Sequence, residues 1–194
     1  GGQEAQRKLM IEKKKLEAVT TVVTHDNCTD GLAAAMIIKE VLPNAEFVFC
    51  QHNTLPYKNL AVRPNMLFVD IVPPVERYKE FLDAGALVLD HHKGVREVIE
   101  AFGENSVFGD EKTQPGVSGA TLAYDHVWCP LWDRVPSPFT EKFARLAGIR
   151  DTWQKKHAEW YEACRQGEIL YFYPREMWMK SSLGSISQRW DSEY

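Results

Sequence analysis

The sequence contains little cysteine and no cysteine pair of the CxxC type. Four cysteines are spread over 194 residues, a spacing unlike that of a small disulfide scaffold. We therefore expect reduced, mostly buried thiols in a cytoplasmic protein. The sequence also lacks a signal-peptide pattern and any apolar run of about 20 residues, the length that crosses a bilayer. These absences argue against a disulfide-stapled secreted module and predict no membrane partner.

The sequence has no marked excess of either charge. Its 23 Lys and Arg residues and 27 Asp and Glu residues give a formal charge of −4. Such a chain is no polycation, so nucleic-acid binding would require a local basic patch or bound metal ions. A hydrophobic fraction of 44% excludes a disordered chain, and the length fits one domain or one domain with a small appendage.

Short apolar segments alternate with helical segments over the first two thirds of the sequence. We expect strands at 18–25, 46–52, 65–72, 86–92 and 106–110. Expected helices cover 29–42, 75–85, 94–103 and 116–128. Because the apolar runs are nearly continuous and alternate with helices, they predict an α/β fold with a parallel five-stranded sheet flanked by helices. The carboxyl ends of such strands share one edge of the sheet, where ligands bind.

The two ends of the sequence differ from this regular part. Residues 1–17 are expected to form an N-terminal helix or a tag-bearing extension. Residues 154–194 are expected to form a helical, aromatic-rich C-terminal extension, which follows a helical stretch at 140–167. Two interpretations of its aromatic residues stay open: they stack on nucleic-acid bases, or they form a hydrophobic helical pack or a homodimer contact. The residues concerned are Tyr171, Tyr173, Trp178 and Trp190.

Polar clusters follow the expected strands at their carboxyl ends. The clusters are HDNCTDG at 25–31, Asp70, Asp90-His91-His92 and, after a later helix, Arg150-Asp151. Taken singly, an aspartate such as Asp30 could simply cap a helix. Carboxylates and imidazoles that converge on one edge would repel each other or lose hydration unless a cation neutralised them, so the pattern predicts metal. Oxygen and imidazole ligands suit Mn²⁺, Mg²⁺ or Fe²⁺ better than a thiolate zinc site.

In this order, the clusters resemble the motifs of the DHH phosphoesterase superfamily. HDNCTDGLAAA resembles motif I, FVDIV motif II, VLDHH motif III and IRDTW the later aspartate motif, while GVSGATLAY resembles the SGA-type helix start. Motif I looks most like that of the oligoribonuclease or cyclic-nucleotide phosphodiesterase branch. The resemblance implies a DHH-type phosphoesterase domain over 18–153, without an evident second substrate-binding domain.

The resemblance also implies roles for individual residues. Asp70 matches the aspartate that bridges two metals, and His92 matches the histidine that faces the substrate phosphate. Asp90 is expected to fix an imidazole or a backbone turn. The residues implied in catalysis are His92, Asp70 and Asp90. The implied metal ligands are His25, Asp30, Asp70, His91 and Asp151.

One position departs from the motif. Many members of the superfamily carry an aspartate two residues before that of the DG pair, where this sequence has Cys28. Two alternatives for completing the first metal site stay open: Cys28 as a weak ligand, or Asp26 as a stand-in for the missing aspartate.

Further residues are expected to contact the substrate phosphate. The start of the helix near residue 116 offers free backbone N–H groups for a phosphate oxygen, although its small residues could equally serve a tight contact between helix and sheet. Arg150 could add a phosphate contact or be solvated. The expected substrate-binding residues are His92, Gly116, Ser118, Gly119 and Arg150.

These observations predict a metal-dependent phosphohydrolase. Its substrate would be a short oligonucleotide, a nucleotide or another phosphate-containing molecule, cleaved at a phosphodiester bond by a water activated by two metals. We expect two Mn²⁺ ions, with Mg²⁺ as the alternative. Two other functions stay open: hydrolysis of polyphosphate, pyrophosphate or a small phosphate ester, and a catalytically weak nucleotide-binding module on the same scaffold.

Overall fold

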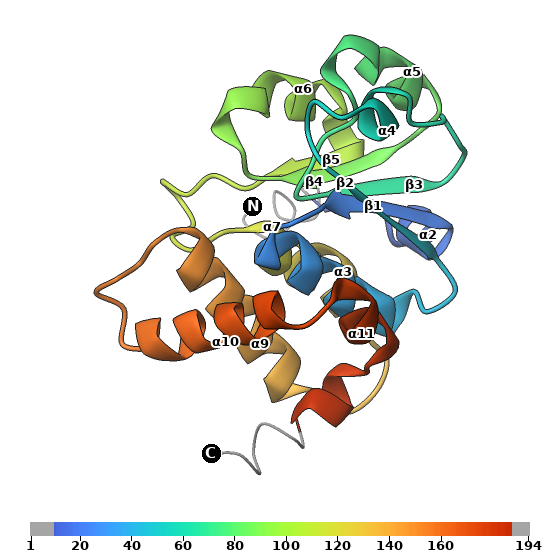
Figure 1. Cartoon of the computed structure of the whole chain (residues 1–194). Helices are drawn as coiled ribbons and strands as arrows, with labels where there is room; N and C mark the ends of the chain where they lie inside the picture. The colour runs from blue at the N-terminus through green and yellow to red at the C-terminus, as the bar shows by residue number, and fades with distance from the viewer. Residues whose placement is uncertain (1–9, 188–194) are drawn as a thin grey trace, which may run out of the picture.

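The computed structural model describes residues 10–187, which form a five-stranded sheet with helices on both faces (Figure 1). All strand pairs are parallel, in the order β2-β1-β3-β4-β5. The strands are β1 (Thr21–His25), β2 (Glu46–Cys50), β3 (Met66–Val69), β4 (Leu87–Asp90) and β5 (Ser106–Phe108). The predicted α/β fold with a parallel five-stranded sheet is therefore confirmed.

The central strands are buried on both faces, which explains their nearly continuous apolar sequence. Along β1, Val22 belongs to one hydrophobic core and Val23 to the other. On β3, Leu67 and Phe68 alternate in the same way, and all four side chains have no exposed area. A parallel sheet needs such double cover, because successive side chains of a strand point to opposite faces.

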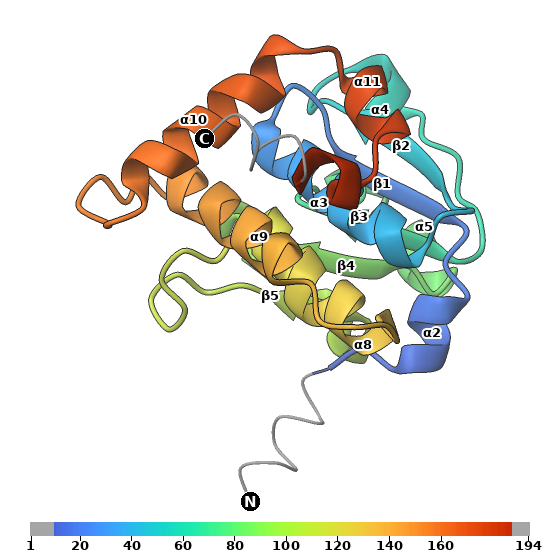
Figure 2. The ribbon, with the colours of Figure 1, turned by 90° about the horizontal axis from the view of Figure 1, so that it is seen from below.

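Helices of unequal number cover the two faces. The upper face in Figure 1 carries α4 (Leu55–Lys58), α5 (Tyr78–Asp83) and α6 (Arg96–Ala101). The lower face, seen from below in Figure 2, carries the larger helical layer. That layer consists of α3 (Thr29–Val41), α7 (Gly119–Ala123), α9 (Pro138–Asp151), α10 (Trp160–Phe172) and α11 (Arg175–Lys180).

Shorter elements complete the fold. These are α2 (Lys13–Glu17), α8 (Cys129–Leu131), a π-helical turn (Tyr124–Trp128) and the 3-10 turns Val75–Arg77, Lys93–Val95 and Gly103–Asn105. A short helix lies at Lys13–Glu17, within the segment expected to form an N-terminal helix or a tag-bearing extension, and residues 1–9 lie outside the described part. Within residues 10–187, no helix is long and apolar enough to span a membrane.

The C-terminal helices pack onto the same core as α3. Leu170 and Trp178 are buried there, and the indole Nε1 of Trp178 donates a hydrogen bond to the carbonyl of Leu170 at 3.1 Å. Tyr171 and Tyr173 stay exposed, at 79% and 45%. Trp178 therefore belongs to the core, whereas the two tyrosines keep much of their surface exposed. Trp190 lies outside the described residues, and the division of the chain at 18–153 and 154–194 stays a prediction.

The cysteines only partly match their expectation. All four are free thiols in the structure. The prediction that they are mostly buried is wrong, because Cys50 is buried but Cys129 is exposed and the other two are half-buried. Cys28 is half-buried because it lies in the loop between β1 and α3, at the carboxyl edge of the sheet, and not inside either core.

Candidate metal centre

Asp70 lies at the centre of the carboxyl edge of the sheet, directly after β3. It adopts φ of 62°, a left-handed conformation that aspartate and asparagine tolerate better than most residues, and its side chain is only 1% exposed. Its backbone N–H donates to the carbonyl of Leu89 at 3.0 Å, which ties the strained residue to β4. A buried carboxylate on strained backbone is an arrangement that proteins keep mainly at functional sites.

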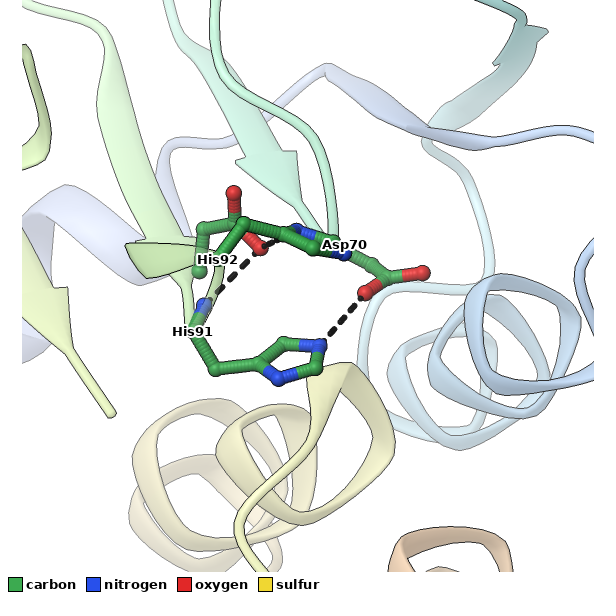
Figure 3. A group of neighbouring side chains, drawn as sticks. Asp70, His91 and His92 are labelled. Carbon is green, nitrogen blue, oxygen red and sulfur yellow. Dashed lines mark hydrogen bonds and ion pairs between the residues drawn. The ribbon is translucent and has the colours of Figure 1, made fainter. Parts of the chain in front are cut away.

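The two carboxylate oxygens of Asp70 face different neighbours. Oδ1 lies 3.1 Å from Nε2 of His91, and Figure 3 shows the His91 ring directed at Asp70. Oδ2 lies 3.5 Å from Sγ of Cys28 and 3.9 Å from Nδ1 of His25. Asp70 therefore lies between two sets of atoms that could bind metal ions, one on each side of its carboxylate.

These atoms form two compact groups, each with all its ligand atoms within 4.8 Å of one another. We call them group one (His25, Cys28 and Asp70) and group two (Asp30, His91 and Asp151). A further set at the same edge joins Asp70 and His91 to Asp90 and His92. The structure thus brings together every residue that the sequence predicts as a metal ligand.

Asp30 is held by the N-terminus of α7. The N–H groups of Gly119 and Ala120 donate to its two oxygens at 2.7 and 2.9 Å, and the carboxylate is 1% exposed. The sequence analysis expects such N–H groups to meet a phosphate oxygen. Instead, a carboxylate of the protein takes them, since a helix N-terminus attracts any nearby anion. Gly119 therefore contacts Asp30 in this structure, and its expected contact with substrate stays a prediction.

The neighbouring residues of this turn have local contacts of their own, and their expected contact with substrate stays a prediction. Ser118 is fully buried, and its hydroxyl accepts a hydrogen bond from the N–H of Thr121 at 3.4 Å as the cap of α7. Gly116 has φ of 85°, and its carbonyl oxygen would lie 2.2 Å from a Cβ placed on Gly148. Ser118 thus caps α7, and Gly116 lies in close contact with α9 at Gly148.

Asp26 forms an ion pair outside the two ligand groups. The guanidinium of Arg175, at the start of α11, donates to Oδ1 of Asp26, which also accepts the N–H of Asn27 at 2.9 Å. Among residues 10–187, Asp26 belongs to none of the potential ligand sets, whereas Cys28 lies with His25 in group one. Of the two alternatives for this site, the geometry favours Cys28.

Asp90 holds the second histidine of the DHH segment. Its Oδ1 accepts the N–H of His91 at 2.9 Å and lies 2.7 Å from Nδ1 of His92. Asp90 is 1% exposed, whereas the side chain of His92 is 46% exposed. The hydrogen bond with Asp90 raises the pKa of His92, and burial opposes this effect. Asp90 therefore fixes and polarises an imidazole that stays open to solvent.

Around group two, the His91 imidazole faces three carboxylates, those of Asp30, Asp70 and Asp151. Burial and the charge of Asp30 raise the pKa of Asp70, and the same two causes raise the pKa of Asp151 to about 6. Burial opposes protonation of His91, yet its hydrogen bonds and charge interactions with Asp30 and Asp70 raise its pKa to about 11. The pKa of Asp30 is lowered despite burial, chiefly by His91. A divalent cation would replace the proton on His91 and relieve this carboxylate repulsion.

Group one also suits a cation. Burial, together with the imidazoles of His52 and His92, lowers the pKa of His25 and keeps this ring in the neutral form that binds metals. Burial and the charge of Asp70 raise the pKa of the Cys28 thiol, so its thiolate form needs a positive charge beside it. The chemistry of both donor sets therefore fits divalent metal ions.

Three residues near the centre have positions that the sequence does not reveal. The guanidinium carbon of Arg150 lies 4.5 Å from the centroid of the Trp153 ring, so this side chain stacks on an indole, and its phosphate role stays a prediction. His52 lies after β2 and is exposed, and the centroid of its ring lies 5.1 Å from the centroid of the His25 ring. Arg175 comes from the aromatic extension, and no sequence motif marks it as a neighbour of β1.

The sequence was compared with models of protein families and with curated proteins. Neither comparison gives a match. The resemblance to the DHH phosphoesterases therefore stays an expectation from the sequence motifs.

Proposed function

We propose that this protein is a metal-dependent phosphoesterase of the DHH type, which hydrolyses phosphodiester bonds in short oligonucleotides or nucleotides. One observation carries the proposal: the two oxygens of Asp70 face two separate groups of ligand atoms. A carboxylate shared in this way is typical of two-metal hydrolytic centres, in which both cations act on one phosphoryl group.

In this proposal, His25, Cys28 and Asp70 hold the first metal. Asp70 also contributes to the second site, whose other ligands are Asp30, His91 and Asp151. The donors are mainly oxygen and imidazole, which favours Mn²⁺, with Mg²⁺ as the alternative. Two such cations would supply Lewis-acid stabilisation of the phosphoryl oxygens and lower the pKa of a nearby water.

His92 is the residue best placed to move a proton. Its Nδ1 lies 2.7 Å from Oδ1 of Asp90, and the side chain is 46% exposed. In this proposal, Nε2 on the opposite side of the ring therefore faces the substrate. Because Asp90 raises the pKa of His92, it favours the protonated ring, whose Nε2 would donate a proton to the leaving oxygen. The protonated ring would also stabilise negative charge on the phosphoryl group.

The experiment that tests this function is hydrolysis of a substrate panel in Mn²⁺ and in EDTA. The panel consists of the dinucleotide pApA, cyclic AMP and inorganic pyrophosphate. We expect Mn²⁺-dependent cleavage of the dinucleotide, and loss of that cleavage in Asp70→Asn, whose side chain keeps the shape of aspartate and tolerates positive φ. Asp83→Asn, at the exposed end of α5, is the matched control and should retain activity.

Other outcomes identify the alternatives. Cleavage of pyrophosphate alone would show a phosphoanhydride hydrolase. Bound metal and bound nucleotide without cleavage of any substrate would show the nucleotide-binding module. Full activity of Asp70→Asn would contradict the two-metal centre itself.

A further inference from the structure

A pocket of about 360 Å³ opens beside group one. Its walls come from the loop after β1, from β2 and from the segment that joins α10 to α11. The lining residues that matter most are His25, Cys28, Phe49, Tyr171, Tyr173 and Arg175. The C-terminal extension therefore contributes directly to a cavity at the metal centre.

The pocket is continuous with the proposed site of catalysis. His25 and Cys28 belong both to its lining and to group one. A substrate whose phosphate lies at the metal centre would therefore extend one of its substituents into this pocket. The occupant is then part of the substrate, and not a ligand of an independent site.

Aromatic and apolar side chains form much of the wall. Leu32 of α3 and Leu170 of α10 contribute apolar surface, and Tyr171 and Tyr173 lie at the side of the extension. Tyr173 packs edge-on against the buried Trp178, with ring centroids 5.8 Å apart, so its ring is held in place while 45% of the residue stays exposed. A fixed and partly exposed aromatic ring is a surface on which a planar group stacks.

The charges inside the pocket compensate one another. The guanidinium of Arg175 forms an ion pair with Asp26, and its carbon lies 4.4 Å from the centroid of the Phe49 ring. Because the pair leaves no net charge on this wall, it favours an uncharged occupant over a second phosphate. The volume lies near the lower end of the usual range for ligand pockets, about 300–1,000 Å³, which suits one base with its sugar better than a longer oligonucleotide.

We propose that this pocket binds the nucleobase of the nucleotide whose phosphate lies at the metal centre. The proposal rests on the proposed function and specifies its substrate: a nucleotide, recognised through its base. The base stacks on Tyr173, while the loop after β1 offers polar groups of Asp26, Asn27 and Thr29 to the base edge. The aromatic extension thus sets the specificity of the enzyme.

The test compares two ligands that differ only by the base. Binding of AMP and of ribose 5-phosphate is measured by calorimetry with the full chain in Mn²⁺. We expect the wild type to bind AMP roughly tenfold or more tightly, the contribution typical of one stacked base. In Tyr173→Ala this ratio should fall close to one, with little change in the affinity for ribose 5-phosphate.

Two further variants control the experiment. Tyr161→Ala removes an exposed tyrosine of α10 that does not line the pocket, so it should keep the wild-type ratio. Tyr173→Leu keeps an apolar contact with Trp178 but removes the aromatic face. It therefore reports on stacking even if the alanine variant folds poorly, and it should also lower the ratio.

The outcomes separate this proposal from the proposed function. Equal affinity of the wild type for the two ligands, or an unchanged ratio in Tyr173→Leu, would overturn the base pocket even if pApA is cleaved. Preference for AMP that depends on Tyr173, in a protein that cleaves no phosphodiester, would support the pocket and overturn the proposed hydrolysis.

Discussion

The Sγ atom of Cys28 lies 3.5 Å from Oδ2 of Asp70. With His25, these two residues form a group of sulfur, nitrogen and oxygen donors, whereas Asp30, His91 and Asp151 offer only nitrogen and oxygen. Thiolate is a softer ligand than carboxylate, and softer ligands favour different metals. The two proposed metal sites are therefore chemically unlike, and this difference can be measured.

Cobalt substitution should reveal the bond between Cys28 and a metal. We expect the Co²⁺-loaded protein to show a thiolate-to-cobalt charge-transfer band in the near ultraviolet, because only a coordinated thiolate produces it. Cys28→Ser should remove the band, and Cys129→Ser, which changes an exposed cysteine, should leave it intact. A band of wild-type intensity in Cys28→Ser would show that this thiol is not a ligand.

Metal content should distinguish Cys28 from Asp26 as the residue that completes the first site. Asp26 is engaged by Arg175, so Asp26→Asn should keep the number of bound Mn²⁺ ions found in the wild type. His25→Ala removes a member of group one and should lose one ion per chain. Elemental analysis after gel filtration measures both values. Loss of an ion in Asp26→Asn would make Asp26 the ligand.

The sheet and the position of the site could be predicted from the sequence because both depend on local patterns. Apolar runs such as that of β3 end at a polar residue, here Asp70, and parallel strands bring these ends to one edge. The residues that follow β1 and β4 join Asp70 at this edge for the same reason. The hydrophobic pattern of the strands therefore carried enough information to predict which candidate metal ligands lie together.

The partners of these ligands could not be predicted, because they depend on contacts between distant segments. Asp30 accepts the N–H of Gly119 across 89 positions, and Arg175 reaches Asp26 across 149 positions. From the sequence alone, the helix start at Gly119 could meet either a phosphate or a carboxylate of the chain. The choice depends on how closely α7 packs against α3 and β3, which no local pattern reports.

The contact of Gly119 with Asp70 should make this glycine sensitive to substitution. A Cβ at position 119 would lie 2.6 Å from Cβ of Asp70, a distance that forces the helix or the aspartate to move. We expect Gly119→Ala to lower the free energy of unfolding by about 1–3 kcal/mol, as overpacked cores do, and to weaken Mn²⁺ binding. Gly184→Ala is the control, since a Cβ there has no heavy atom within 4 Å. Urea unfolding and Mn²⁺ titration measure the two effects, and wild-type values for Gly119→Ala would contradict the tight contact.

Stability of the metal-free protein should fall as the pH rises above neutrality. The pKa of His91 is raised from 6.5 to about 11 in the folded chain by Asp30 and Asp70, although burial opposes the shift. A folded state that binds a proton more tightly than the unfolded state gains stability that is fully present below pH 6.5 and is lost as the pH rises through about 11. Urea unfolding in EDTA between neutral and alkaline pH should therefore show a steady decrease in the free energy of unfolding.

Replacing His91 isolates its contribution to this pH dependence. The glutamine of His91→Gln does not titrate at position 91, so the free energy of unfolding of this variant in EDTA should decrease less over the same interval. Saturating Mn²⁺ should also flatten the wild-type profile, because the cation takes over the neutralisation of Asp30 and Asp70 and releases the proton from the ring. Equal slopes for the wild type and His91→Gln in EDTA would show that the carboxylates of group two do not hold a proton on His91, and the electrostatic argument for a cation at this position would then fail.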